Sequence, residues 1–240
     1  PSGGSGLVTI IGDGGSLFGD ETGLQLRDVH VIPDPVWSAE PIDHQTFDKT
    51  DLTALMVSNT PDELILELPF NSDWNGLQLH VIFEANNNAA GAARDPFEQP
   101  VNYGHADRPD YALTYKYSSN DYGDFRRWNA TGNAWEIWNL TDEIYSAAFV
   151  NQDIHTQWVS KEAERVVIRM PWTPFGGQPT SLRMEAYLTQ EDGVKRSAFD
   201  SAPQDATLNL TFDYTDPDAN WDVALGPVTL VAWGAPYVVK

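Results

Sequence analysis

The chain has 240 residues, of which 14 are basic and 35 acidic, so its formal net charge is −21. This acidic balance argues against nucleic acid as a partner, because binding to phosphates requires clustered Lys and Arg. The absence of cysteine excludes a disulfide framework, a thiol nucleophile and a cysteine-ligated metal. No run of about 18 apolar residues occurs, so the sequence predicts no membrane insertion.

The beginning of the chain differs in composition from the rest. Residues 1–6 read Pro-Ser-Gly-Gly-Ser-Gly, which is typical of a flexible linker or a cloning remnant rather than a signal peptide. Residues 7–240 contain no convincing linker and no internal repeat. Apolar residues make up 41% of the chain, which is enough for a core. We therefore expect a single domain over residues 7–240.

Short runs of alternating apolar and polar residues, separated by Gly, Pro, Asn and Asp, predict β-strands along most of the chain. In chain order, the predicted strands are 7–11, 53–58, 64–68, 77–84, 111–117, 134–138, 166–170, 182–189, 207–212 and 227–233. The alternation is clearest in 77–84, where Leu, Leu, Val and Phe at the odd positions share one face. Only 141–149 and 161–165 have a weak helical character. The pattern predicts an all-β fold, an antiparallel β-sandwich of the jelly-roll or immunoglobulin type, in one domain.

Several short segments, taken in order, resemble one family of modules. They are 47–55, 63–69, 73–79, 111–113 with 121–123, 166–171 and 182–193. This series resembles the C-terminal DOMON-like or family 9-like carbohydrate-binding β-sandwich modules of amylopullulanases and glucodextranases, over roughly residues 12–206. The resemblance implies a non-catalytic module, extracellular or at the cell surface, that is covalently linked to a catalytic domain and holds an α-glucan or a related, starch-like polysaccharide.

Aromatic residues are concentrated between Tyr103 and Trp138, where nine of them occur at about twice the density of the whole chain, which is 12%. Asp, Asn and two Arg residues lie among them. A pyranose stacks its C–H face on such rings, while its hydroxyls bond to amides, carboxylates and guanidinium groups. The block therefore predicts polysaccharide or oligosaccharide binding, although strand alternation turns about half of its rings into a core.

The segment 122–128 is predicted to be a polar connection between two strands, and Trp128 is expected to be its exposed ring. Trp135 and Trp138 are three positions apart, so on a strand they should face opposite ways. Trp37 and Trp74 are alternatives on separate loops. The candidate ligand-binding residues are Trp128, Tyr122, Arg126, Arg127, Trp135, Trp138, Trp37 and Trp74.

An acidic segment between two predicted strands has the spacing that opens an EF-hand calcium loop, with carboxylates and an amide at every second position. The candidate metal ligands, for a structural Ca²⁺, are Asp216, Asp218, Asn220 and Asp222. Trp221 and Pro227 replace the required glycine and glutamate, which excludes a complete EF-hand loop. A polar turn with Asp and Asn chosen for their backbone preferences explains the same pattern.

Catalytic constellations are not evident. The glutamates on or beside predicted strands do not form the alternating acidic triplet of sandwich glucanases, and His80, His105 and His155 are scattered. The predicted function is therefore a non-catalytic carbohydrate-binding module. Two alternatives stay open: a catalytic β-sandwich glycan lyase or hydrolase, and a structural surface module without a ligand.

Overall fold

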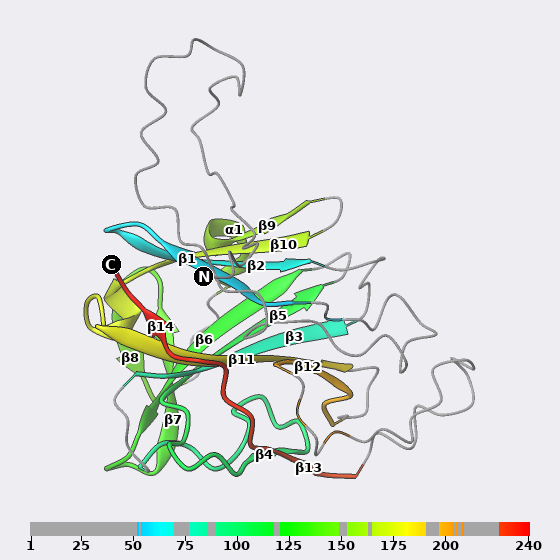
Figure 1. Cartoon of the computed structure of the whole chain (residues 1–240). Helices are drawn as coiled ribbons and strands as arrows, with labels where there is room; N and C mark the ends of the chain where they lie inside the picture. The colour runs from blue at the N-terminus through cyan, green and yellow to red at the C-terminus, as the bar shows by residue number, and fades with distance from the viewer. Residues whose placement is uncertain are drawn as a thin grey trace, which may run out of the picture.

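The computed structural model describes residues 52, 54–69, 77–85, 90–117, 121–148, 153–162, 165–190, 197–203, 205, 208 and 226–240. These residues form the all-β, sandwich-like fold that the sequence predicts, with antiparallel sheets stacked in layers (Figure 1). The predicted strand 7–11 lies outside the described residues, and so does 207–212 apart from residue 208.

The smaller of the two main sheets has four strands in the order β1-β2-β10-β9. They are β1 (Met56–Asn59), β2 (Glu63–Pro69), β9 (Val159–Lys161) and β10 (Arg165–Pro171). Leucine, isoleucine and valine dominate the two central strands, because β-branched and other apolar side chains pack well on a pleated surface.

The larger sheet has the order β12-β11-β3-β5-β6-β7-β8, and β14 adds to one end of β11. Its strands are β3 (Leu77–Glu84), β5 (Tyr111–Tyr117), β6 (Tyr122–Asn129), β7 (Ala134–Asn139), β8 (Ile144–Ser146), β11 (Ser181–Gln190), β12 (Asp200–Ala202) and β14 (Tyr237–Val238). Apart from these sheets, β4 (Val101–Tyr103) pairs in parallel with β13 (Val228–Leu230).

Three local expectations were wrong. The segment 122–128 is not a connection, because it lies in strand β6. The helical character of 141–149 is also wrong, since this segment contains β8, and 161–165 runs from the end of β9 to the start of β10. Among the described residues the one α-helix is α1 (His155–Trp158), and a 3-10 turn covers Thr173–Phe175.

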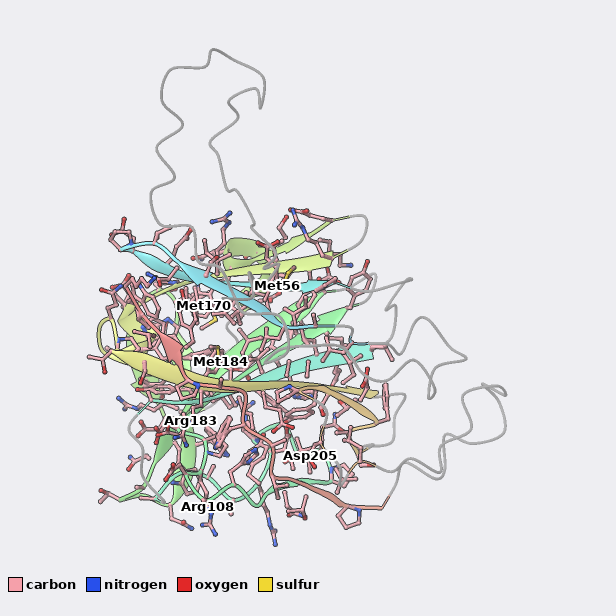
Figure 2. All side chains as sticks on the ribbon, viewed as in Figure 1. Met56, Arg108, Met170, Arg183, Met184 and Asp205 are labelled. Carbon is pink, nitrogen blue, oxygen red and sulfur yellow. The ribbon has the colours of Figure 1, made fainter. Side chains whose placement is uncertain are left out.

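The face of the large sheet that meets the small sheet, here the inner face, is apolar. Even-numbered residues of β11 and odd-numbered residues of β3 point into it and form one buried cluster with the small sheet. Figure 2 shows Met170 and Met184, both fully buried, between the two sheets. Burying a side chain of this size contributes roughly 1.5–3 kcal/mol to stability.

The opposite face of the large sheet, here the outer face, is covered as well. The 90–99 loop and the β4–β13 pair lie against it, and a second apolar cluster forms there around Ile82 and Tyr187. Arg183 and Asp205 lie on this side in Figure 2. Because both faces are covered, all eight residues of β3 are buried. The outer face mixes apolar groups with polar ones, including His80, Glu185 and Thr189.

Candidate functional site

A pair of tryptophans lies at the end of the β6–β7 hairpin. Trp128 and Trp135 are cross-strand partners, so they share the outer face of the sheet. Their ring centroids are 5.6 Å apart with planes at 69°, an edge-to-face contact. Both rings are half-buried and pack against the outer-face cluster. Each therefore presents part of its surface to solvent while the rest is anchored.

The 90–99 loop fixes the polar edge of each indole. The Nε1–H of Trp128 donates to the carbonyl of Ala90 at 2.8 Å, and the Nε1–H of Trp135 donates to the carbonyl of Arg94 at 3.2 Å. An indole has this single donor, and once it is bonded the ring is held in one orientation. The loop therefore determines how the tryptophan pair is displayed.

Arg126, also on the outer face, holds the same loop. Its guanidinium donates to the carbonyl of Pro96 at 2.5 Å and lies over the ring of Phe97, 4.6 Å from its centroid. Two further donors, Nε and Nη2, bond to Asp124 at 3.1 and 2.8 Å. Burial raises the pKa of Asp124, and the charge of Arg126 opposes that shift. Arg126 thus supports the loop beneath the tryptophans.

Arg127 points to the inner face instead. Its guanidinium donates to Glu136 at 2.6 Å and lies over the ring of Tyr145, 4.1 Å from its centroid. Asn129 donates to the other oxygen of Glu136 at 2.8 Å. The hydrogen bond from Arg127, followed by that from Asn129, lowers the pKa of Glu136. Because Arg127 is 43% exposed, it keeps donors available at the surface of the hairpin.

The remaining candidates on these strands are separated from the pair. Trp138 is 5% exposed and belongs to the inner-face core, where its ring meets Tyr145 edge-on. The prediction that Trp135 and Trp138 face opposite ways is confirmed. Tyr122 begins β6, six residues before Trp128, which is about 20 Å along an extended strand. The structure therefore groups Trp128 and Trp135 over Arg126, and leaves the others elsewhere.

Six predicted site residues lie outside the described part of the chain. They are Trp37, Trp74, Asp216, Asp218, Asn220 and Asp222. Within the described residues, no group of three or more His, Asp or Glu side chains is placed to hold a metal ion. The calcium prediction for the acidic segment stays a prediction.

A buried polar network on the outer face was not predicted from the sequence. Asp95 accepts hydrogen bonds from the hydroxyls of Tyr187 at 2.5 Å and Tyr103 at 3.5 Å, and those hydroxyls are 2.8 Å apart. Nearby, His105 Nε2 and a carboxyl oxygen of Glu185 lie 2.9 Å apart. The polar positions of β3 and β11 alternate with apolar ones, a pattern typical of a solvent-facing surface. The only sequence signal was the connection 85–110 between two predicted strands, which is much longer than a hairpin loop.

No protein-family model, curated protein or solved structure matches this chain. In the described part of the chain, no helix has the length and apolar character needed to cross a membrane. The function is therefore inferred from the residues of the hairpin and from the loop that supports them.

Proposed function

We propose that the protein is a non-catalytic carbohydrate-binding module and that the β6–β7 hairpin is its ligand site. The observation that carries the proposal is the half-exposed pair of Trp128 and Trp135 with both indole N–H groups bonded inward. Rings fixed in this way stack on a sugar without losing much further freedom on binding. The favoured ligand is a neutral polysaccharide, such as an α-glucan.

Sugar recognition on the tryptophan pair depends mainly on stacking, because the polar groups Arg127, Asn129 and Glu136 of the same hairpin lie on the inner face. Asn129 and Glu136 pair with one another beside the turn, and Arg127 has donors at the surface. Sugar hydroxyls also exchange bonds to water for bonds to protein with little net gain. The affinity of one site is therefore expected in the roughly micromolar to millimolar range.

The wider setting belongs to the same proposal. A module of this kind acts as part of a larger extracellular or cell-surface protein, covalently linked to a catalytic domain that works on the same glycan. A structural Ca²⁺ on the acidic segment 216–222 is proposed with it and is tested by the change in melting temperature on adding a chelator.

The deciding experiment is electrophoresis in native gels that contain starch, glycogen or xylan. We expect retardation by at least one glycan, and Trp128→Ala should weaken it about tenfold or more, the equivalent of about 1.4 kcal/mol. Trp138→Phe on strand β7 is the matched control, because Trp138 lies in the core and should not affect retardation. Unchanged mobility in every glycan, with no change in tryptophan fluorescence, would refute the proposal. Release of reducing ends or unsaturated products would instead support the catalytic alternative.

A further inference from the structure

Asp95 closes the loop that holds the tryptophan pair. One of its carboxylate oxygens accepts the backbone N–H of Phe97 at 2.7 Å and that of Gln99 at 3.2 Å. These bonds shape the turn in which Glu98 adopts a positive φ of 66°. Asp95 directly follows Arg94, whose carbonyl accepts the Trp135 indole. The side chain of Asp95 is therefore one residue from the acceptor that orients the ring.

The second oxygen of Asp95 faces the sheet. Besides the hydroxyls of Tyr187 and Tyr103, it lies 3.5 Å from Nδ1 of His80. His80 and Tyr187 come from β3 and β11 of the large sheet, and Tyr103 comes from β4. His80 stacks on Tyr187 with a centroid distance of 4.7 Å and bonds to Thr189 through Nε2. The carboxyl group is fully buried, so these partners replace water around it.

We propose that Asp95 is the positioning residue of the tryptophan pair and that its ionised form holds Trp128 and Trp135 in the arrangement that binds glycan. The glycan part of this inference rests on the proposed function, whereas the arrangement of the rings does not. As a carboxylate, Asp95 accepts bonds from two N–H groups and two hydroxyls, and its charge strengthens them.

Uptake of one proton from solvent changes that set. The protonated inner oxygen of Asp95 donates to the hydroxyl oxygen of Tyr187, and the Tyr187 hydroxyl then donates to Tyr103 instead of to Asp95. The bonds from the N–H groups of Phe97 and Gln99 become weaker, because their acceptor no longer carries a charge. The charged and titratable groups facing Asp95 are His80 on β3, Tyr187 on β11, Tyr103 on β4 and Arg126 on β6. Burial is the main cause that raises the pKa of Asp95, to about 6, while Tyr187, the two N–H groups and Arg126 oppose the shift.

The test uses the tryptophan pair as its own probe, because indoles in edge-to-face contact give an exciton couplet in circular dichroism. In the full chain, the couplet should lose about half of its amplitude or more between about pH 8 and about pH 4.5, with its midpoint near the pKa of Asp95. Asp95→Asn keeps an acceptor oxygen but removes the charge, and its couplet should not titrate. The matched control is Glu185→Gln, a buried carboxyl on the same face, which should titrate like the unchanged protein.

A second variant keeps the test informative if Asp95→Asn does not fold. Tyr187→Phe removes a hydrogen bond that stabilises the carboxylate, so the midpoint should move to higher pH. A flat couplet in the unchanged protein, or one that titrates equally in Asp95→Asn, overturns the inference. If the couplet titrates as expected but glycan retardation is absent at every pH, the positioning role stands and the proposed function fails. If both hold, retardation should weaken about threefold or more on acidification.

Discussion

The two faces of the large sheet are built differently although the same strands form both. On the inner face, β3 and β11 contribute Leu, Val, Phe, Met and Ala to one apolar cluster with the small sheet. On the outer face, the alternate residues of those strands contribute His80, Glu185 and Tyr187, which contact polar side chains of the covering segments. The contrast suggests that the inner face supplies most of the stability, whereas the outer face sets the geometry of a surface.

The largest effect should come from the inner face. Leu66 on β2 is fully buried in the cluster, so Leu66→Ala leaves a cavity that the surrounding sheet fills only partly. We expect the free energy of unfolding to fall by about 2–5 kcal/mol. Urea denaturation measures it, and a loss below about 1 kcal/mol would show that this layer is loosely packed.

An intermediate, pH-dependent effect should come from the outer face. The pKa of Asp95 rises from 3.8 to about 6 on folding, so the folded state binds the proton more tightly than the unfolded state. This contribution to stability is fully present below about pH 4 and is lost as the pH rises through about 6. As the pH rises from about 4 to about 6, the free energy of unfolding of Asp95→Asn should therefore gain about 3 kcal/mol relative to that of the unchanged protein.

His105 on the same face has the opposite effect on how stability changes with pH. The stability of Asp95→Asn must therefore be compared with that of the unchanged protein at each pH. Burial lowers the pKa of His105 from 6.5 to about 4, so its contribution to stability is lost as the pH falls from about 6.5 to about 4. The difference between the urea midpoints of the unchanged protein and of Asp95→Asn across this range gives the contribution of Asp95, because both proteins contain His105. Parallel stability curves would contradict the assignment.

The smallest effect should come from the exposed surface of the hairpin. Arg127 pairs with Glu136 and is 43% exposed, and ion pairs in such positions contribute about 0–1 kcal/mol. Arg127→Ala should therefore change the urea midpoint little and leave glycan retardation unchanged, because Arg127 lies on the face opposite the tryptophan pair. A stability loss as large as that of Leu66→Ala would contradict this, because it would mean that the contact of Arg127 with Tyr145 stabilises the protein as much as a core residue does.

The sequence predicts the inner face well and the outer face poorly, for one physical reason. Period-two alternation gives 77–84 and 111–117 their observed bounds and separates Trp135 from Trp138. It cannot indicate that the polar side of a strand is covered by a distant loop, so His80 resembles a solvent-facing residue. Strand β6 was missed because its buried Asp124 pairs with its half-buried Arg126, which also bonds to the 90–99 loop. Partners remote in sequence overrode local propensity there.

Strand β3 has a consequence for the chain before it folds. All eight of its residues are buried, so none of them is available to carry a solvent-facing charge that discourages aggregation. Its sequence, Leu-Gln-Leu-His-Val-Ile-Phe-Glu, is β-prone and almost uncharged, the type of segment that pairs with copies of itself when exposed. Protection against self-association must then come from elsewhere in the chain. The net charge of −21 supplies it as long-range repulsion between unfolded molecules, and raising the salt concentration should weaken that protection during refolding.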